Sequence, residues 1–415
     1  MQFYEFKETQ ERVILIGVQT EVGDDVEASL DELEELAETA GAETVAKVIQ
    51  NREAVHPGTY IGKGKIEEVA SLLRALDANG VICDDELSPA QLNNLERELD
   101  CKVMDRTLLI PDIFAGRAVS SEGKIQVELA QLRYRAARLV GLRESLSRLG
   151  GGIGTRGPGE KKLETDRRLI RTRISALKAE LAQVEKHREL IRGKRSRGNL
   201  KTAAIVGYTN AGKSTLLNTL TGAGILAEDK LFATLDPTTR VLELKDGQQI
   251  LLTDTVGFIR KLPHHLVEAF KSTLEEAKYA DYIIHVVDAS NPQAELQMFT
   301  VYETLRELGA TGKKIVTLLN KQDQVTGSSI RDLKADYTVK CSARTGEGLD
   351  EFKDVLAKLL AEDQIYLEEL YPYSEAGKIQ KIREFGSLLS EEYREDGIFV
   401  KARVPAEIFV SVMPK

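Results

Sequence analysis

The sequence of 415 residues contains little cysteine, little histidine and no tryptophan. Its three cysteines, Cys83, Cys101 and Cys341, lie far apart and lack the spacing of metal ligands, so we expect them to be reduced and structural. Its five histidines form no cluster, and we interpret the adjacent His264 and His265 as part of a solvated loop. These scarcities argue against a disulfide framework and against a cysteine and histidine metal site.

Long hydrophobic runs are also missing, since none approaches the about 18 residues that a membrane helix needs. The first eight residues are acidic and contain no long apolar core. We therefore expect a cytoplasmic, monomeric chain without an integral membrane segment. The length, together with a hydrophobic content of 42%, favours about three domains with ample core.

A phosphate-binding loop lies between an apolar run at 203–206 and a helical run at 215–220. Its glycines let backbone N–H groups and the helix dipole face phosphates, while Lys213 reaches the β- and γ-phosphate oxygens. Ser214 then provides a hydroxyl ligand for Mg²⁺. The loop residues are Gly207, Tyr208, Thr209, Asn210, Ala211, Gly212, Lys213 and Ser214.

A second phosphate motif, Asp254, Thr255, Val256 and Gly257, follows the apolar run 250–252. We predict that this run is a buried strand whose carboxyl end presents Asp254 to the metal, and that the N–H of Gly257 contacts the γ-phosphate. The next residue, Phe258, cannot hydrogen-bond water. We therefore expect a slow basal rate of nucleotide hydrolysis, with the attacking water held by backbone groups, by a partner or by a residue of the first switch segment.

The first switch segment is predicted at 232–240, and its nucleotide contacts are Phe232, Ala233, Thr234, Leu235 and Asp236. The pattern F-x-T-L followed by x-P resembles the first switch of GTPases, and that resemblance implies Thr234 as the second Mg²⁺ ligand, with Thr238 and Thr239 as alternatives. The predicted catalytic residues are Lys213, Thr234 and Gly257, and the predicted metal ligands are Ser214, Thr234 and Asp254. Asn210 resembles the asparagine through which some relatives bind an activating K⁺, and the sequence leaves that question open.

Two further patterns specify guanine. Asn320, Lys321, Gln322 and Asp323 follow the apolar run 315–319, and Ser342, Ala343 and Arg344 come later. The carboxylate of Asp323 can accept from the ring N1–H and the exocyclic amine, which adenine does not offer. Asn320 would hold N7, Lys321 would lie over the base, and the N–H of Ala343 would meet O6. With these motifs, residues 201–360 resemble the translation-factor-related class of small GTPases.

A basic helical region precedes this domain. Apolar residues at 125, 129, 132, 136, 139 and 146 recur at helical spacing, as do those at 163, 170, 174, 177, 181, 184 and 191. The glycine-rich segment 150–159 separates them, which predicts an antiparallel hairpin. Residues 131–200 contain 19 Lys plus Arg against 7 Asp plus Glu, in a chain of net charge −9. Arg148, Arg156, Lys161 and Lys162 around the tip favour contact with RNA phosphates.

The two ends of the chain have weaker patterns. Apolar and helical runs alternate between 11 and 115, which predicts a small α/β domain with a parallel sheet. Residues 60–65 favour a turn that starts a helix, and Ser88 before Pro89 is typical of a helix cap. In the tail we expect a helix at 376–389, a strand at 397–404 and another possible strand at 409–412.

The predicted fold class is multidomain α/β. A P-loop GTPase domain is preceded by a small α/β domain with a helical hairpin and followed by a small α+β domain. The predicted domains are 1–115, 116–198, 199–362 and 363–415.

Four further motifs, at 60–65, 105–107, 112–115 and 154–160, make the chain resemble the HflX family. That resemblance implies a cytosolic GTPase that hydrolyses GTP to GDP with Mg²⁺ and binds the large (50S) ribosomal subunit and its rRNA through the hairpin tip. It also implies dissociation of stalled or idle ribosomes under stress. Three alternatives stay open: a ribosome-assembly GTPase, an RNA remodeller whose N-terminal domain uses ATP, and a signalling GTPase with a protein partner only.

Overall fold

The computed structural model describes residues 11–20, 25–147, 158–197, 200–222, 231–232, 237–245, 248–261, 271–325 and 330–414. The chain divides into two compact units. The first contains Met1–Glu185, Glu228–Asp236 and Val256–Leu274, and the second contains Lys186–Ala227, Pro237–Thr255 and Glu275–Lys415. Among the helices of the described residues, none is both long enough and apolar enough to cross a bilayer.

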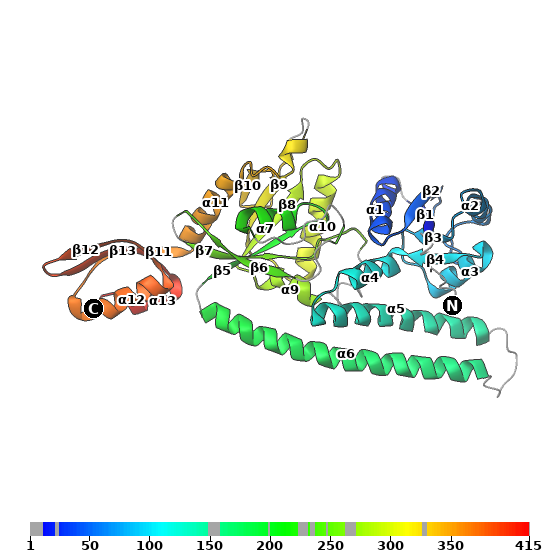
Figure 1. Cartoon of the computed structure of the whole chain (residues 1–415), viewed down its shortest axis with the longest axis horizontal. Coiled ribbons are helices and arrows are strands. Elements are labelled where there is room, and N and C mark those ends of the chain that lie inside the picture. The colour runs from blue at the N-terminus through cyan, green and yellow to red at the C-terminus, as the bar shows by residue number, and fades with distance from the viewer. Residues whose placement is uncertain are drawn as a thin grey trace, which may run out of the picture. The chain divides into compact units, whose positions relative to one another are not determined.

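A four-stranded parallel sheet begins the first unit, with strand order β2-β1-β3-β4 (Figure 1). Strands β1 and β3 are buried almost throughout, because helices cover a parallel sheet on its faces. The expected α/β organisation with a parallel sheet is confirmed. The elements are β1 (Arg12–Gln19), α1 (Val26–Thr39), β2 (Glu43–Asn51), α2 (Lys63–Ala75), β3 (Gly80–Cys83), α3 (Pro89–Leu99), β4 (Lys102–Asp105) and α4 (Arg106–Arg117).

Local sequence explains where these helices begin. Ser88 and Gln91 form a reciprocal capping box at α3, with Pro89 in the first turn, which confirms the predicted cap. Helix α2 begins directly after Gly62, whose N–H donates to Gln50 Oε1 at 2.8 Å. Asp105 caps α4 by accepting from the N–H of Leu108 at 2.9 Å.

Two long helices follow, α5 (Ser121–Ser147) and α6 (Pro158–Arg197), and they lie side by side (Figure 1). The Arg173 guanidinium donates to both carboxylate oxygens of Glu128, at 2.7 and 2.8 Å, and so joins them. Leu177 is fully buried on α6. The tip residues 150–157, including Arg156, lie outside the described residues, as do Arg148 and the side chains of Lys161 and Lys162.

Helix α5 buries a second face that the heptad pattern did not predict. Val127, Ala130 and Tyr134 are buried, and α5 packs against α3 and α4. The Tyr134 hydroxyl donates to Asp105 Oδ1 at 2.9 Å, and Arg138 contacts Asp105 Oδ2 at 3.2 Å. The helix is therefore anchored to the end of β4 by polar contacts as well as by apolar packing.

The second unit contains a six-stranded sheet with strand order β10-β9-β8-β5-β7-β6. Neighbouring strands are parallel except β6 and β7, which are antiparallel. The sheet confirms the expected α/β GTPase domain. Its elements are β5 (Lys201–Gly207), α7 (Lys213–Thr221), β6 (Thr238–Glu243), β7 (Gln249–Asp254), α9 (Lys271–Tyr279), β8 (Tyr282–Asp288), α10 (Ala294–Glu307), β9 (Lys314–Asn320), η1 (Gln322–Gln324), β10 (Tyr337–Lys340) and α11 (Leu349–Glu362).

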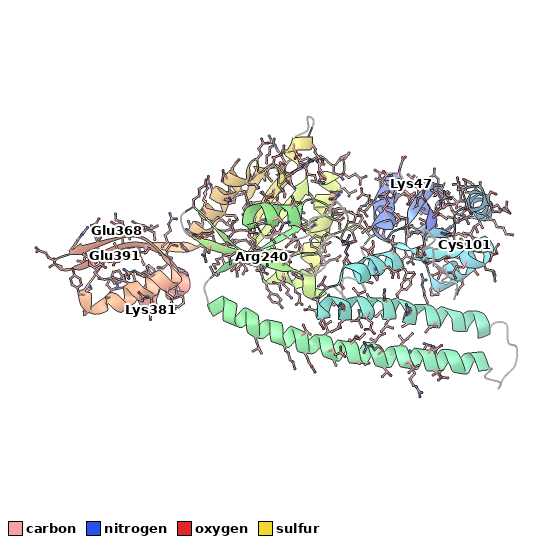
Figure 2. The ribbon with its side chains drawn as sticks, viewed as in Figure 1. Lys47, Cys101, Arg240, Glu368, Lys381 and Glu391 are labelled. Carbon is pink, nitrogen blue, oxygen red and sulfur yellow. The ribbon has the colours of Figure 1, made fainter. Side chains whose placement is uncertain are left out.

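The tail forms an antiparallel sheet in the order β11-β13-β12. Glu368, labelled in Figure 2, lies on β11 and pairs with Lys401 on β13 at 2.9 Å. The elements are β11 (Gln364–Tyr371), η2 (Tyr373–Glu375), α12 (Ala376–Phe385), β12 (Ser387–Arg394), β13 (Gly397–Pro405) and α13 (Ala406–Val412).

Two expectations for the tail were wrong. The helix predicted at 376–389 ends at Phe385, because Gly386 lies against β13, where an added Cβ would be 2.6 Å from the Arg403 carbonyl oxygen. The strand proposed at 409–412 is part of helix α13. Ile408 and Val412, spaced four residues apart, face the apolar core of the tail as one side of a helix.

Candidate nucleotide-binding site

The phosphate loop connects the carboxyl end of β5 to the first turn of α7. Gly212 has φ +95°, and a Cβ there would lie 2.3 Å from Asn320 Nδ2. At Gly207 a Cβ would lie 2.2 Å from the Val286 carbonyl oxygen. Both positions need glycine because neighbouring groups approach the backbone closely, and the loop thereby leads its backbone N–H groups toward the start of a helix.

Lys213 occupies the first position of α7 and is only 7% exposed. Its Nζ donates to the carbonyl oxygen of Tyr208, at 2.7 Å. Burial lowers the pKa of Lys213 to about 8, and the nearby Asp254 only partly offsets this. A buried ammonium held by a neutral carbonyl is suited to an anionic ligand, because phosphate charge would restore its usual pKa.

Ser214 and Asp254 meet at the same end of the sheet. The Ser214 hydroxyl donates to Asp254 Oδ2 at 2.7 Å, and Asp254 is fully buried at the end of β7. The Thr255 hydroxyl donates to the Ile205 carbonyl oxygen at 2.8 Å, which attaches this motif to β5. A hydroxyl and a carboxylate are hard oxygen ligands and fit Mg²⁺.

Within the described ranges, no group of three or more His, Cys, Asp and Glu side chains is arranged to hold a metal ion. Mg²⁺ commonly takes one or two protein ligands and completes its shell with phosphate oxygens and water. Ser214 and Asp254 provide two oxygen ligands next to the phosphate loop.

At the other end of the site, Asn320 joins two loops. Its Nδ2 donates to the Ala211 carbonyl oxygen, and its Oδ1 accepts from the Ala343 N–H, both at 2.8 Å. Asn320 and Ala343, both predicted to contact the base, are therefore joined by a hydrogen bond, and their contact with the base stays a prediction. The amide of Asn320 thus fixes the phosphate loop relative to the loop after β10.

Asp323 accepts from the Ser342 hydroxyl, with 2.7 Å between Oδ1 and Oγ. Lys321 has a left-handed backbone conformation at φ +61°, and its Nζ lies 2.7 Å from Asp288 Oδ2. Sequence reasoning missed Asp288, although its place at the end of the buried run 283–287 was a signal for a ligand-side residue. These contacts fix the orientation of the Asp323 carboxylate and of the Lys321 side chain.

The predicted switch residues are only partly described. Thr234, the expected second Mg²⁺ ligand, lies outside the described residues together with Ala233, Leu235 and Asp236. Phe232 is described, and its ring meets Phe114 edge-on with 4.5 Å between centroids. Phe258 is 1% exposed, so its ring is buried.

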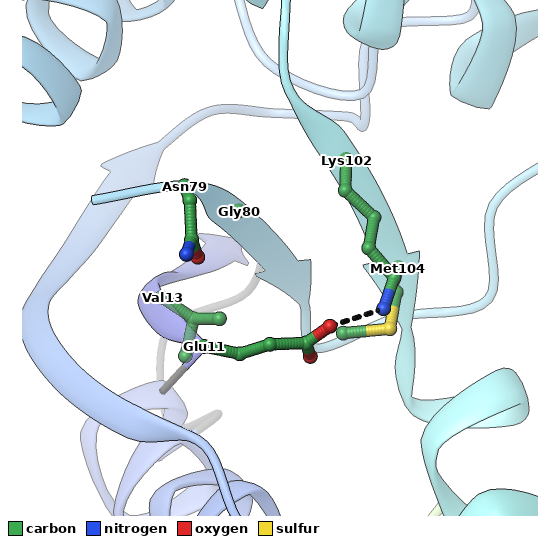
Figure 3. A pocket seen from close by; sticks show the side chains of 6 residues that line it. All are labelled: Glu11, Val13, Asn79, Gly80, Lys102 and Met104. Carbon is green, nitrogen blue, oxygen red and sulfur yellow. Dashed lines mark hydrogen bonds and ion pairs between the residues drawn. The ribbon is translucent and has the colours of Figure 1, made fainter. Parts of the chain in front are cut away.

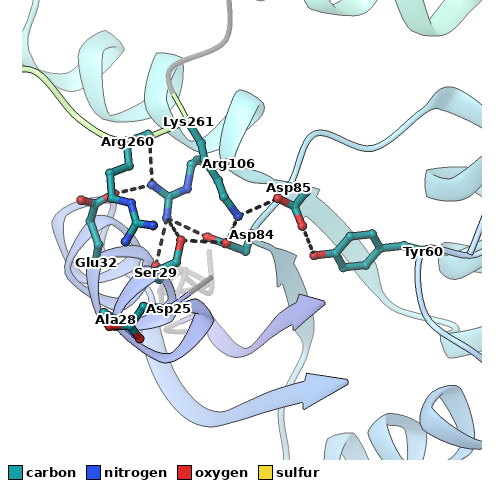
Figure 4. Close-up of polar contacts among 10 residues, drawn as sticks. All are labelled: Asp25, Ala28, Ser29, Glu32, Tyr60, Asp84, Asp85, Arg106, Arg260 and Lys261. Carbon is teal, nitrogen blue, oxygen red and sulfur yellow. Dashed lines mark hydrogen bonds and ion pairs between the residues drawn. The ribbon is translucent and has the colours of Figure 1, made fainter. Parts of the chain in front are cut away.

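Sequence reasoning also missed a second polar cluster, at the carboxyl ends of β3 and β4 in the first unit (Figure 4). Asp84 and Arg106 are its buried centre, at 2.7 Å, and Lys261 reaches Asp84 at 2.5 Å. These residues are far apart in sequence. The available signal was the position of Asp84 after the apolar run 81–83 and of Arg106 after β4.

The parallel sheet, the phosphate loop after β5, the carboxylate after β7 and the guanine-type tetrapeptide after β9 together define a P-loop GTPase. Three family models match along the chain: "GTP-binding GTPase N-terminal" at 27–115, "GTP-binding GTPase Middle Region" at 117–195 and "50S ribosome-binding GTPase" at 202–321.

Whole-chain relatives give the family. The GTPase HflX of Lacrimispora saccharolytica is 68% identical over 98% of this chain and 97% of that protein. The GTPase HflX of Caldanaerobacter subterraneus subsp. tengcongensis is 49% identical over 97% of this chain and 93% of that protein. The crystal structure of the SsGBP and GDP complex is 27% identical, with TM-score 0.49, and covers 84% of this chain and 98% of that chain. The chain belongs to the HflX family of GTPases.

Proposed function

We propose that this GTPase binds the large ribosomal subunit and its rRNA, and uses GTP binding and hydrolysis as a switch that dissociates stalled or idle ribosomes under stress. The match of residues 202–321 to the 50S ribosome-binding GTPase family carries the proposal. The excess of positive charge between 131 and 200 supports it, since a chain of net charge −9 gathers cations where a polyanion would bind.

The phosphate end of the site supplies charge and backbone donors. Lys213 would stabilise the β- and γ-phosphates, including the charge that develops as the terminal phosphoryl group is transferred. Gly212 and the following N–H groups at the start of α7 would bind phosphate oxygens. Gly257 would give its N–H to the γ-phosphate, because it follows Asp254 by three residues in the second phosphate motif.

Mg²⁺ would be held by Ser214, Asp254 and Thr234. When bound, it neutralises phosphate charge and orients the β- and γ-oxygens. Asn210 lies in the same loop with φ +60°, and we propose it as the protein ligand of an activating K⁺. Comparing GTP turnover in K⁺ and Na⁺ for the wild type and Asn210→Ala tests this role.

The base end would recognise guanine through Asp323. Its carboxylate would accept from N1–H and the exocyclic amine, and Ser342 would hold that carboxylate in place through the 2.7 Å hydrogen bond. The stem of Lys321 would cover the base. Asn320 would hold N7 of the base and the N–H of Ala343 would meet O6, and Gln322 and Arg344 would lie in the same base-binding loops.

Hydrolysis would depend on the ribosome. Phe258 occupies the position where a water-orienting side chain is common, and its buried ring cannot fulfil that role. The free enzyme would therefore hydrolyse GTP slowly, and the large subunit would act as activator by supplying or positioning a group for the water. Cycling between GTP and GDP would then control release from the subunit.

The domain organisation that we propose follows the sequence boundaries 1–115, 116–198, 199–362 and 363–415. The hairpin, with the segment 150–159 at its tip, would contact rRNA. The chain would act in the cytoplasm as a monomer on the ribosome.

The decisive experiment measures GTP hydrolysis with and without purified large subunits at fixed Mg²⁺ and salt. A variant lacking residues 150–159 is assayed in parallel, together with co-sedimentation. We expect strong stimulation that weakens in the deletion variant. No stimulation and no co-sedimentation would contradict the ribosomal proposal, and preference for precursor particles over mature subunits would indicate an assembly factor instead.

A further inference from the structure

The carboxyl edge of the N-terminal sheet holds a buried network of charges (Figure 4). Arg106 is 1% exposed, and its Nη2 donates to Asp84 Oδ1 at 2.7 Å and to the Ser29 carbonyl oxygen at 2.9 Å. Its Nη1 donates to Glu32. Next to Asp84, Asp85 accepts from the Tyr60 hydroxyl at 2.7 Å. We call this set the edge cluster, and its members are Ser29, Glu32, Tyr60, Asp84, Asp85 and Arg106.

The edge cluster binds the chain directly after the second phosphate motif. Lys261 Nζ lies 2.5 Å from Asp84 Oδ2 and 2.7 Å from Asp85 Oδ1. Arg106 Nη1 donates to the carbonyl oxygen of Arg260 at 3.2 Å. All these residues belong to the same compact unit. The edge cluster thus holds a backbone carbonyl and the adjacent side chain, only a few residues after Gly257.

Lys261 balances part of the negative charge of the edge cluster, so its contact with Asp84 and Asp85 differs from an ordinary ion pair on the surface. Glu32, Asp84 and Asp85 provide three carboxylates, for which Arg106 provides one guanidinium. Burial raises the pKa of Asp84, but the charges of Arg106 and Lys261 outweigh it and hold that pKa below its usual value. Lys261 is therefore the second cation that the edge cluster requires.

Helix α4 also contacts the first switch segment. Phe114, on this helix, packs edge-on against Phe232 with an interplanar angle of 67°, and both rings are buried. Arg106 begins the same helix. One helix of the N-terminal domain therefore contacts Phe232, which precedes Thr234 by two residues, and Arg260, which follows Gly257 by three.

We propose that Lys261 is a positioning residue for GTP. Its contact with Asp84 and Asp85 would hold residues 257–261 in the conformation in which Gly257 binds the γ-phosphate. This inference rests on the switch mechanism proposed above. A segment that is already ordered loses less conformational freedom when the γ-phosphate binds, and GDP lacks the group that this segment would meet. The contact should therefore favour GTP over GDP, and GTP should in turn strengthen the contact.

The test compares the Kd values of a non-hydrolysable GTP analogue and of GDP, without ribosomes. Lys261→Met should weaken binding of the GTP analogue by about 5- to 150-fold and change GDP binding by less than about twofold. Asp85→Asn, which alters the N-terminal side of the contact, should change the ratio of the GTP-analogue Kd to the GDP Kd in the same direction. Lys261→Arg should leave this ratio unchanged. In the Lys261→Met/Asp85→Asn double variant the ratio should change by less than the two single effects combined.

Lys102→Met is the matched control. Lys102 begins β4, at the opposite end from Asp105, and pairs with Glu11 at 2.7 Å across an exposed pocket (Figure 3). It removes a lysine–carboxylate pair from the same sheet and should leave both Kd values unchanged.

An unchanged ratio in both Lys261→Met and Asp85→Asn would overturn the proposal, as would equal weakening of GTP analogue and GDP. If the variants change the ratio of the two Kd values as predicted, but large subunits do not stimulate GTP hydrolysis by the wild type, the ribosomal function is contradicted and the positioning role of Lys261 is supported.

Discussion

Two sheets in this chain place polar side chains at the carboxyl ends of their parallel strands, where ligands of open α/β sheets commonly bind. In the GTPase sheet this edge presents Lys213 after the phosphate loop and Asp254 after β7. In the N-terminal sheet it presents Asp84 after β3 and Arg106 after β4. Each edge therefore buries one cation close to carboxylates.

The two cations are stabilised differently. Burial lowers the pKa of Lys213 to about 8, because the Tyr208 carbonyl and Asp254 do not compensate for lost hydration. Burial also acts to lower the pKa of Arg106, but Asp84 and Glu32 outweigh it and raise that pKa. The neighbouring carboxylates therefore outweigh the effect of burial on the pKa of Arg106, whereas Asp254 only partly offsets it for Lys213.

The largest effect should come from Asp323, which contributes to ligand recognition and not to the sheet's own charge balance. Asp323→Asn replaces the acceptor of the guanine N1–H by an amide, so preference should move toward xanthine nucleotides by on the order of 10²- to 10⁴-fold. Competitive binding of GTP and XTP measures this shift. Asp350→Asn, at an exposed position of the same domain, is the control, and unchanged guanine preference in Asp323→Asn would contradict the assignment.

The next largest effect concerns the edge of the N-terminal sheet, where the charges of the chain balance one another. Arg106→Met leaves Asp84 and Glu32 buried without their main cation, and should lower the free energy of unfolding by about 3–5 kcal/mol. Because the chain has no tryptophan, urea unfolding is followed by circular dichroism.

Arg173→Met is the control for Arg106→Met. It removes an equivalent guanidinium that pairs with Glu128 in an exposed position, and such pairs contribute little. Arg106→Met should therefore lower the free energy of unfolding far more than Arg173→Met does. Equal stability of Arg106→Met and wild type would show that pairing at the N-terminal edge does not stabilise the fold.

The sequence predicted the edge of the GTPase sheet because the residues that bind phosphate there are adjacent in the chain. The phosphate loop requires Gly212, Lys213 and Ser214 in immediate succession, and flanking apolar runs predict the strand and helix that it connects. The edge cluster combines Ser29, Asp84 and Arg106, and the Lys261 that it binds lies still farther along the chain. Spacing cannot predict such a cluster, because only the fold brings these residues together.

Helical periodicity had a comparable limit. It predicted the apolar positions of α5 that include Leu129, but not the burial of Val127 and Tyr134 on a second face, since that depends on packing against α3 and α4. In the tail, the short apolar segment 409–412 suited either a strand or a helix. The tertiary core that buries Val412 selects the helix.

A third prediction concerns Lys213, where the same kind of substitution should change stability in the direction opposite to that expected for Arg106→Met. Lys213→Met removes a buried charge whose cost the nucleotide-free protein bears, so it should raise the free energy of unfolding by about 1–3 kcal/mol, less the lost hydrogen bond to Tyr208. Nucleotide binding should be lost in the same variant. Urea unfolding without nucleotide and a GTP binding assay measure the two effects, and destabilisation by Lys213→Met would remove the contrast between the edges.

The smallest effect is the pH dependence that the Lys213 pKa implies. In the nucleotide-free protein this pKa is about 8, below the ordinary 10.5 of an unfolded chain. Below pH 8 both states carry the proton, and the full cost of burial is present. Between these values the unfolded chain binds a proton that the folded chain has lost, so stability rises with pH, by at most about 1.4 kcal/mol per unit. The difference between wild type and Lys213→Met isolates this contribution from other titrating groups. It should shrink between pH 8 and 10.5, whereas a constant difference would mean that Lys213 keeps its ordinary pKa and that the edge is already electrostatically complete without nucleotide.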